Sequence, residues 1–299
     1  MELWFTERQT PSVAFSCRVV RTLDVRRTVY QDLAVLETEP FGRMLVLDGA
    51  IQLTLADEFI YHEMLAHVPL FAHGRPRRVL VVGGGDGGTV REVLRHPEVE
   101  EVVLAEIDPE VVEACRRHFP ELASSIDDPR VRLCLGDGIA HVAEHPGEYD
   151  VILVDSTDPV GPAVGLFSES FYAGCRRALR PGGLMAAQTE SPVFHADLIA
   201  RAFSRMRAVF PVTRLYLAPV PTYPGGLWSF TIGSTGPDPA DPWGGHQPRG
   251  REDEGTTGPR GGFLATRYYT PEVHRAAFAL PAFVQQILSA APQPEAVAT

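Results

Sequence analysis

The feature that most constrains the fold is an apolar run that enters a glycine-rich turn. Residues 79–82 are Val, Leu, Val and Val, and residues 83–88 follow as Gly-Gly-Gly-Asp-Gly-Gly before a helix-like stretch. This order predicts a buried strand that turns into a helix, an arrangement that binds nucleotide-like ligands at the helix N-terminus. Gly83, Gly85 and Gly88 satisfy the G-x-G-x-x-G spacing, which alone is a weak signal because glycine turns also serve steric needs.

The acid within this turn, Asp86, restricts the ligand further. A carboxylate at this position repels a pyrophosphate or a ligand carboxylate, and it attracts a ligand that presents a cation. The turn therefore favours a positively charged, adenosine-containing ligand over NAD.

The composition excludes several classes of function. The 299 residues include 27 Lys and Arg against 38 Asp and Glu, and a net charge of −11 suits neither nucleic acid nor an anionic membrane. The first residues lack an apolar signal core, and no apolar run approaches membrane-spanning length. Four scattered cysteines without a C-x-x-C pair fit reduced thiols. We expect a soluble cytoplasmic enzyme.

The first part of the chain has the pattern of a small antiparallel sheet. Residues 13–55 alternate in short β-rich pieces separated by turn signals such as Asp48-Gly49. A helix is expected to begin near Asp57 and to run to Pro69. We therefore place an N-terminal β domain with its linking helix at residues 1–70 and a catalytic domain at residues 71–299.

From residue 77 to residue 233 strands alternate with helices, which predicts a parallel sheet with helices on both faces, Rossmann-like and of the methyltransferase type. The expected strands are 78–83, 101–106, 131–135, 150–155, 184–188, 212–217 and 227–233, and the expected helices are 87–96, 109–117, 137–144, 168–179 and 195–209. A terminal helix is expected from about Pro281. The segment 234–262 is rich in Gly, Pro, Asp and Arg, and we expect a disordered loop there.

Acidic residues follow three of the expected strands, at the edge where an open α/β sheet binds its ligand. Glu106 lies about 20 residues past the glycine turn, where an acid accepts hydrogen bonds from ribose hydroxyls. Asp137 could accept from an adenine amino group or cap the next helix, and both interpretations stay open. Asp155 and Asp158 are expected to face the cleft together, although Asp158 could instead form an Asx-turn.

Two other motifs are excluded. His62 and His67 resemble the H-E-x-x-H zinc helix, but they are five residues apart and do not share a helix face as residues four apart do. No serine lies in a G-x-S-x-G sequence, which disfavours an α/β-hydrolase.

Taken together, these motifs resemble the polyamine aminopropyltransferase family, the spermidine synthases most closely. The resemblance is carried by YQD at 30–32, LVLDGAIQLT at 45–54, DEFIYHEMLAHVPL at 57–70, GGGDGGTVREV at 83–93, EID at 106–108, GDG at 136–138, DSTDPVGP at 155–162, LFSESFY at 166–172, PTYPGG at 221–226 and YYTPEVHRAAFALP at 268–281. It spans nearly the whole chain, and GGGDGG, DSTDP and TYPGG are specific in combination. The main departure is the segment 234–262, where the family usually has a less Gly-rich connection.

The resemblance implies transfer of an aminopropyl group from decarboxylated S-adenosylmethionine to putrescine, which gives spermidine and 5′-methylthioadenosine without a metal or a prosthetic group. It implies that Asp155 accepts the proton of the attacking amine, that Asp86 holds the aminopropyl ammonium and that Asp158 helps to bind the diamine. The other residues implied on the amine side are Tyr61, His62, Ser156, Thr157, Gln188 and Tyr223. Those implied on the nucleoside side are Gln31, Gln52, Glu106, Asp137, Gly138 and Pro162.

Three alternatives stay open at this point. An S-adenosylmethionine-dependent methyltransferase would normally leave the glycine turn uncharged, because Asp86 and Asp155 repel the carboxylate of that cofactor. A non-catalytic nucleoside-binding module would leave the paired acids without a function. An aminopropyltransferase could also use agmatine, cadaverine or spermidine. A homo-oligomer, either a dimer or a tetramer, is expected.

Overall fold

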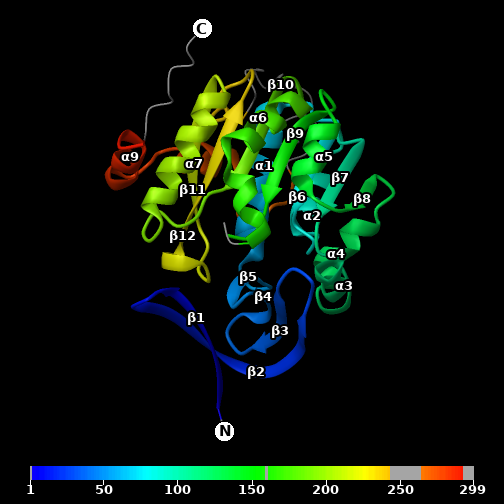
Figure 1. Ribbon diagram of the computed structural model, residues 1–299, viewed down its shortest axis with the longest axis vertical. Helices are drawn as coiled ribbons and strands as arrows, with labels where there is room; N and C mark the ends of the chain where they lie inside the picture. The colour runs from blue at the N-terminus through cyan, green and yellow to red at the C-terminus, as the bar shows by residue number, and fades with distance from the viewer. Residues whose placement is uncertain (1, 159–160, 243–263, 292–299) are drawn as a thin grey trace, which may run out of the picture.

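The computed structural model describes residues 2–158, 161–242 and 264–291 of the chain. Figure 1 shows a small sheet at the N-terminal end of the molecule and, above it, a larger sheet with helices packed against it. Among the described residues, no helix is both long and apolar enough to cross a membrane.

The small sheet is antiparallel and contains five strands in the order β1-β2-β3-β4-β5, which confirms the predicted sheet. Its strands are β1 (Leu3–Thr10), β2 (Val13–Arg27), β3 (Asp32–Thr38), β4 (Gly42–Leu47) and β5 (Ala50–Thr54). Asp48 and Gly49 join β4 to β5 with φ values of 48° and 81°, the left-handed conformations that a two-residue hairpin turn requires. The sequence did not predict β1, which precedes the expected sheet.

The large sheet contains seven strands in the order β11-β12-β10-β9-β6-β7-β8. They are β6 (Arg78–Gly83), β7 (Glu101–Glu106), β8 (Val131–Leu135), β9 (Tyr149–Asp155), β10 (Leu179–Gln188), β11 (Val212–Pro219) and β12 (Leu227–Ser234). The ladders among β6, β7, β8, β9 and β10 are parallel, whereas β12 is antiparallel to β10 and to β11. The expectation of a wholly parallel sheet was therefore wrong at β12. The connection from β11 to β12 is residues 220–226, which include the turn η3 (Pro224–Gly226), and so short a connection cannot make a parallel crossover.

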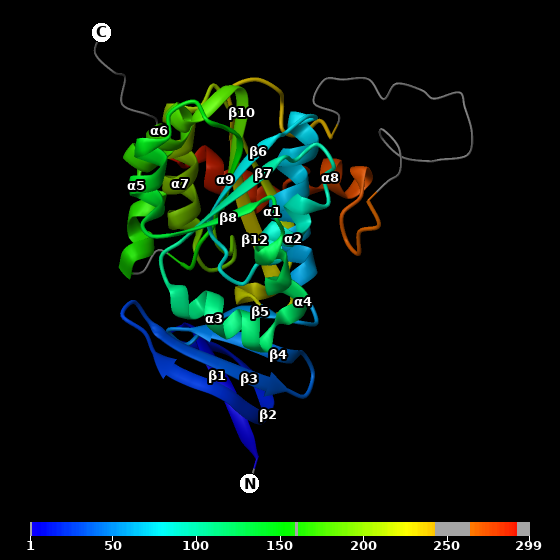
Figure 2. The same cartoon turned by 90° about the vertical axis from the view of Figure 1, so that its right-hand side faces the viewer.

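Helices cover both faces of the large sheet, as Figure 2 shows. They are α1 (Glu58–His73), α2 (Gly88–Leu94), α3 (Pro109–His118), α4 (Pro120–Ala123), α5 (Gly138–Glu144), α6 (Glu169–Ala178), α7 (Ala196–Val209), α8 (Pro271–Ala277) and α9 (Ala282–Ser289), with 3₁₀ turns η1 (Ser124–Asp127) and η2 (Gly161–Phe167). Val79 and Val81 of β6 pack in the core on the α1 side, and Leu80 and Val82 pack in the core on the α6 side. This alternation explains why the strands read as continuous apolar runs.

Three local predictions need correction. Helix α1 continues past Pro69 to His73, so that proline lies within the helix. Helix α8 was not expected, although Thr270 caps it and Pro271 occupies its first turn, a typical helix start. Strand β10 begins at Leu179, ahead of the expected start at residue 184, and it includes the triplet Pro181-Gly182-Gly183 at the place where the register with β9 shifts.

The predicted disordered loop 234–262 was wrong for its first nine residues. Ser234 belongs to β12 and is fully buried, and the Asp238 carboxylate accepts a hydrogen bond from Arg214. The backbone oxygen of Pro239 accepts a hydrogen bond from Nε2 of the buried His274 in α8. Residues 243–262 of that prediction lie outside the described residues, as does most of the tail after Ala290.

Helix α1 packs against α2, β9 and β10, so it lies with the large sheet. The division of the chain at residue 70 stays a prediction.

Candidate active site

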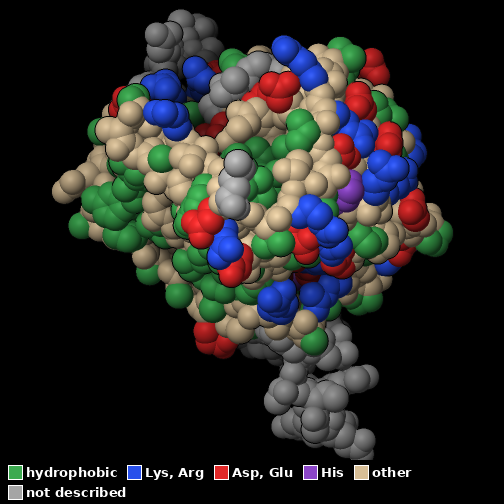
Figure 3. Space-filling view, turned by 90° about the horizontal axis from the view of Figure 1, so that it is seen from below, with side chains coloured by type: hydrophobic (Ala, Val, Ile, Leu, Met, Phe, Trp, Pro, Cys, Tyr) green, Lys and Arg blue, Asp and Glu red, His purple; other side chains and the backbone are tan. Residues whose placement is uncertain are grey.

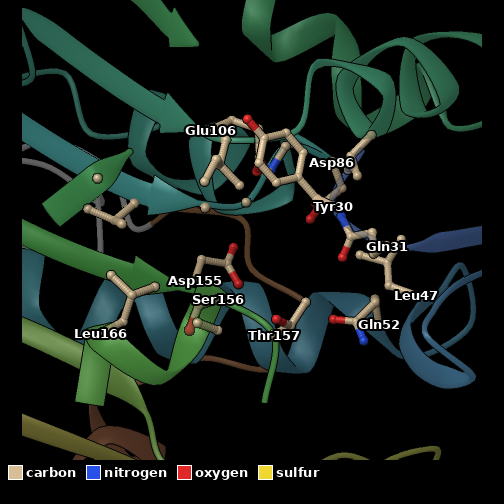
Figure 4. Close-up of a pocket in the computed structure, with 18 of the residues that line it drawn as sticks. Tyr30, Gln31, Leu47, Gln52, Asp86, Glu106, Asp155, Ser156, Thr157 and Leu166 are labelled. Atoms are coloured by element: carbon tan, nitrogen blue, oxygen red, sulfur yellow. The ribbon is translucent and has the colours of Figure 1, made fainter. Parts of the chain in front are cut away.

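A cleft opens at the carboxyl ends of β6, β7, β8 and β9 and is closed on one side by the small sheet. Figure 4 shows acids from the large sheet facing Gln31 and Gln52 of the small one. The residues of the sequence prediction that line the cleft are Gln31, Gln52, Tyr61, His62, Gly83, Gly85, Asp86, Glu106, Asp137, Gly138, Asp155, Ser156, Thr157, Asp158 and Tyr223. The structure thus brings together segments that are far apart in the sequence.

The glycine turn after β6 packs tightly on the end of β9. Gly83 has a φ of 79°, and a Cβ atom on it would lie 2.1 Å from the backbone oxygen of Asp155. Only glycine fits that conformation and that approach. The close packing is what brings the Asp86 turn beside Asp155.

Glu106 lies at the end of β7 on one side of the cleft. Its Oε2 accepts a hydrogen bond from the Gly85 backbone nitrogen at 3.0 Å, and its Oε1 accepts one from Asp108 at 2.8 Å. Burial raises the pKa of Glu106 to about 7 in spite of these hydrogen bonds. Each carboxylate oxygen keeps a second lone pair, so Glu106 can still accept hydrogen bonds from ligand hydroxyls.

Asp137 caps a helix and also lines the cleft, and its contact with an adenine amino group stays a prediction. Its Oδ1 accepts a hydrogen bond from the backbone nitrogen of Ile139, so it caps α5. The same residue lines the cleft, next to Gly138. Pro162 lies in η2, but its side chain lies outside the described part of the structure, so its predicted contact with the base stays untested.

Asp108 joins the small sheet to the cleft. Its Oδ2 accepts hydrogen bonds from the hydroxyl of Thr28 at 2.7 Å and from Nε2 of Gln31 at 2.9 Å, and its Oδ1 caps α3 at Glu110. These contacts fix the Gln31 side chain at the edge of the cleft.

Asp155 ends β9, and both of its oxygens accept hydrogen bonds. The hydroxyl of Tyr61 donates to Oδ1 at 2.8 Å, and the hydroxyl of Thr89 donates to Oδ2 at 2.6 Å. Burial and the negative charge of Asp86 raise the pKa of Asp155, against the opposing effects of His62 and the two hydroxyls. A carboxylate with a raised pKa is a better proton acceptor than an ordinary aspartate.

His62 lies between two carboxylates. Its Nδ1 is 2.6 Å from Oε2 of Glu58, and its Nε2 is 3.4 Å from Oδ1 of Asp86. Burial disfavours the charged ring, but Asp86 and Glu58 outweigh burial and raise the pKa of His62 to about 9. A Cβ atom on Gly88 would lie 2.2 Å from the ring, so the third glycine of the motif makes room for this histidine.

The histidine spacing that excluded a zinc helix is explained by the packing. His67 does not face the cleft with His62, because its ring contacts His96 at 2.9 Å and Glu92 at 3.2 Å. In the described part of the chain, polar atoms of His62, Asp86 and Asp155 form one cluster and all lie within 4.8 Å of one another.

A second, smaller pocket adjoins the cleft and shares Gln52, Tyr61, Asp158 and Tyr223 with it. Burial, together with Glu190 and Glu7, raises the pKa of Asp158 to about 8. Burial likewise raises the pKa of Glu7 to about 7. We name the three carboxyl groups Glu7, Asp158 and Glu190 the acidic end of the cleft.

The acidic end carries a strained backbone and a partner histidine. Glu190 has a φ of 75°, in the left-handed region that residues other than glycine rarely adopt. Its Oε2 is 3.1 Å from Nδ1 of His195, which is about one-third exposed. Such backbone outliers tend to occur at ligand-binding and catalytic positions.

Gln188 lines this second pocket, but its polar atoms serve the protein itself. Its Nε2 donates to the backbone oxygens of Ser156 and Thr157, and its Oε1 accepts from Glu190. It holds the end of β9 in place and presents its remaining surface to the pocket.

The sequence reasoning missed several residues around the cleft: Glu7, Tyr30, Glu58, Thr89, Asp108, Glu190 and Trp228. Two signals were present for this set. Glu190 follows the end of β10 as the other acids follow their strands, and Glu58 is four residues before His62, on the same helix face. Glu7 gave no signal, because it is one acid in a strand that was not predicted.

The fold and the cleft define a methyltransferase-like α/β protein with an acidic ligand site. Residues 58–240 match the spermine/spermidine synthase domain, and residues 3–54 match the spermidine synthase tetramerisation domain. The chain is 52% identical to the polyamine aminopropyltransferase of Caldicellulosiruptor bescii over 288 residues, which cover 96% of this chain and 99% of that protein. It is also 52% identical to the polyamine aminopropyltransferase of Moorella thermoacetica, over 98% of this chain and 99% of the relative.

Solved structures agree with these relatives. A spermidine synthase in complex with the transition-state analogue AdoDATO superposes with a TM-score of 0.88 at 40% identity, over 96% of this chain and 95% of that one. The spermidine synthase of Thermotoga maritima gives a TM-score of 0.86 at 39% identity, over 96% and 94%. The chain therefore belongs to the spermine/spermidine synthase family, and it is an enzyme of the aminopropyltransferase class.

Proposed function

We propose that the enzyme transfers the aminopropyl group of decarboxylated S-adenosylmethionine to putrescine, with spermidine and 5′-methylthioadenosine as products. The observation that carries the proposal is the order of acids along one cleft. Glu106 lies at one side, and Asp86 and Asp155 lie together in the middle. Asp158 and Glu7 line the adjoining pocket, and Glu190 lies beside Asp158. This order suits two cationic substrates, the sulfonium donor and the diamine, that bind end to end along the cleft.

On the donor side, we assign the ribose hydroxyls to Glu106 and the adenine to Asp137 and Gly138, with Gln31 and Gln52 bordering the nucleoside and the sulfonium. Asp86 pairs with the aminopropyl ammonium. Ordinary S-adenosylmethionine carries a carboxylate that would approach Asp86 and Asp155, so the same acids select against it. The AdoDATO complex of the spermidine synthase relative agrees with a decarboxylated, adenosine-based donor.

On the acceptor side, we assign one ammonium of the diamine to the acidic end and the reacting nitrogen to Asp155. Tyr61, Tyr223 and Gln188 surround the chain between them, with His62, Ser156 and Thr157 nearby. An amine with a pKa of ~10.4 is almost wholly protonated at neutral pH, so making it nucleophilic costs roughly 4–5 kcal/mol. A carboxylate that accepts this proton in place lowers that barrier.

The proposed reaction needs no group beyond the two substrates and Asp155. The amine nitrogen attacks the methylene carbon beside the sulfonium, the carbon–sulfur bond breaks, and its electron pair neutralises the sulfur. The proton of the amine passes to Asp155. The leaving group is a neutral thioether, so its departure needs no acid.

The acceptor is tested by product profiling. The purified enzyme is supplied with decarboxylated S-adenosylmethionine and, separately, with putrescine, cadaverine, agmatine and spermidine, and the products are identified by mass spectrometry. We expect the highest kcat/KM with putrescine. A higher value for another amine would reassign the acceptor, and no aminopropyl product with any amine would overturn the proposal.

We also propose that the protein is a homo-oligomer built through its small sheet. The supporting observations are the match of residues 3–54 to a tetramerisation domain and the apolar side chains that β1 and β2 leave exposed. Figure 3 views the molecule from the side of this sheet and shows hydrophobic side chains among charged ones. Leu3, Trp4, Val20 and Val25 are each more than half exposed. Light scattering of the purified protein distinguishes a dimer or tetramer from a monomer.

A further inference from the structure

A chain of buried charges runs from α2 through α1 to the cleft. Nη1 and Nη2 of Arg91 donate to the two carboxylate oxygens of Glu58, at 3.1 and 2.9 Å. Glu58 in turn contacts Nδ1 of His62 at 2.6 Å. The Glu58 and His62 side chains are 4% and 3% exposed, so water and salt screen this contact little.

Both nitrogens of the His62 ring face a carboxylate, Glu58 on one side and Asp86 on the other. A neutral imidazole carries one N–H, so its other nitrogen would direct a lone pair at a carboxylate oxygen. An imidazolium donates from both nitrogens. The two flanking carboxylates therefore favour a protonated ring, and the raised pKa of His62 agrees with it.

The positive charge of the His62 imidazolium acts on Asp86 and Asp155, which lie beside it. The ligand atoms of Asp86 and Asp155 lie within 4.8 Å of each other and of the His62 ring nitrogen. Two carboxylates so close together in a buried site repel, and one of them takes up a proton unless a cation offsets the repulsion. The other titratable groups near the ring are Arg91, which pairs with Glu58, and Tyr61, whose ring packs edge-on against His62.

We propose that Glu58, held by Arg91, is a positioning residue that keeps His62 as an imidazolium and thereby keeps Asp155 as a carboxylate beside Asp86 before a ligand binds. The consequence for catalysis rests on the proposed function. Asp86 is then ready to pair with the donor ammonium, and Asp155 begins the reaction as a carboxylate. As an imidazolium, the His62 ring has no lone pair with which to accept the amine proton.

The test is the pH dependence of donor binding, measured by calorimetry in the absence of amine. Decarboxylated S-adenosylmethionine carries a permanent sulfonium and an alkyl ammonium with a pKa of ~10, so between about pH 5 and pH 9 the titrating groups belong to the protein. In the wild type, affinity falls at the pH where the cleft carboxylates take up protons. Glu58→Gln keeps the size of the side chain and an acceptor for Arg91, but it removes the charge that holds the His62 proton.

The sign of the shift is decisive. If Glu58 maintains the imidazolium, Glu58→Gln raises the pH at which affinity falls by about one unit, because Asp86 and Asp155 lose the cation beside them. If Glu58 acts only as a nearby negative charge, its removal lowers that pH. A downward shift or no shift would overturn the inference.

Glu92→Gln is the matched control. Glu92 also contacts Arg91 and a buried histidine, but that histidine is His67, which faces His96 away from the cleft. Glu92→Gln therefore perturbs the α1–α2 contact in the same way and should leave the pH dependence of donor binding as in the wild type. A shift as large as that of Glu58→Gln would show that both variants act through general loosening.

If Glu58→Gln does not fold, His62→Gln tests the same charge. Loss of the imidazolium should again raise the pH at which donor affinity falls, and an unchanged profile would show that the ring is neutral. The proposed function fails separately, through a wild type that neither binds the donor nor forms an aminopropyl product. A wild type that does both, with no upward shift in the variants, overturns only the role of Glu58.

Discussion

The middle of the cleft and its acidic end both concentrate carboxylates, but they balance the charge differently. In the middle, Asp86 and Asp155 lie against His62, whose pKa of about 9 keeps a cation in place. At the acidic end, burial and repulsion among the carboxylates raise the pKa of Asp158 to about 8 and that of Glu7 to about 7, although the Ile51 backbone nitrogen donates a hydrogen bond to Glu7 and His195 lies beside Glu190. One region has its own counter-charge, and the other has carboxyls that a cationic ligand would ionise.

This difference matches the two tasks of the proposed reaction. Acids that must be ionised before the donor arrives need a permanent partner, since burial alone would neutralise one of them. Acids whose ligand is itself an ammonium can stay partly protonated until it binds, which limits their repulsion in the free enzyme. The predictions below compare the two regions, beginning with the largest effect.

The largest effect is expected at Asp155. Asp155→Asn keeps an acceptor for only one of the Tyr61 and Thr89 hydroxyls and cannot accept the amine proton, so kcat should fall by about 10²–10⁴-fold. Steady-state kinetics with saturating donor and putrescine measure this loss. The affinity for 5′-methylthioadenosine should change little, and near-normal turnover would show that Asp155 is not the proton acceptor.

The next effect should separate the two regions from each other. Asp86→Asn should lower the affinity for the donor by about 10–100-fold. It should also reduce the preference of the enzyme for the donor over S-adenosylmethionine, because the variant no longer repels the carboxylate of that compound. Asp158→Asn should raise KM for the diamine and leave that preference unchanged. Calorimetry with both sulfonium compounds gives the affinity ratio for each variant. If the two variants changed the ratio equally, the division of the cleft into two regions would be wrong.

The sequence predicted much of the fold because the apolar runs of β6 and β9 are buried on both faces. It also predicted most of the cleft, since Glu106, Asp137 and Asp155 follow strands that end at one edge of the sheet. Strand β1 was missed for a physical reason. Its Leu3 and Trp4 are exposed and its Glu7 is buried, which is the reverse of the apolar-in pattern that predicts a strand.

Tertiary contacts account for other failures. The composition of the segment after Ser234 predicted disorder, yet Pro239 is ordered through a backbone oxygen that His274 binds, and composition does not record backbone contacts. The charge on His62 likewise depends on Asp86, which is 24 residues further along the chain. Neither the state of that histidine nor the raised pKa of Asp158 follows from spacing alone.

The pH dependence of the two substrates should differ. The acidic end loses protons between about pH 7 and pH 8, in line with the pKa values of Glu7 and Asp158, and the diamine loses its reacting proton more easily as pH rises. We therefore expect kcat/KM for putrescine to climb from pH 7 to pH 9, by at most about tenfold per unit, and to fall with added salt. Donor affinity should vary less between pH 7 and pH 8, because His62, with a pKa of about 9, keeps most of its charge there. A flat amine profile without a salt effect would argue against an alkylamine acceptor.

The smallest effect concerns the stability of the fold. Replacing a buried glutamate by glutamine at pH 8 should stabilise the protein at the acidic end and destabilise it beside the middle of the cleft. The pKa of Glu7 rises from 4.5 in the unfolded chain to about 7 in the folded protein, so folding is penalised progressively as pH rises from 4.5 to 7 and by a constant amount above that. Glu7→Gln keeps the acceptor for the Ile51 backbone nitrogen and removes the penalty, so at pH 8 it should stabilise the protein by about 1–3 kcal/mol. Glu58→Gln should instead destabilise the protein at pH 8, since His62 and Arg91 hold the pKa of Glu58 below its usual value against burial.

Thermal melts of both variants at pH 5 and pH 8 measure the difference. The increase in melting temperature of Glu7→Gln should be much smaller at pH 5 than at pH 8. A Glu7→Gln protein that melts lower than the wild type at pH 8 would show that the carboxylates of the acidic end already have a counter-charge, and the contrast between the two regions would fail.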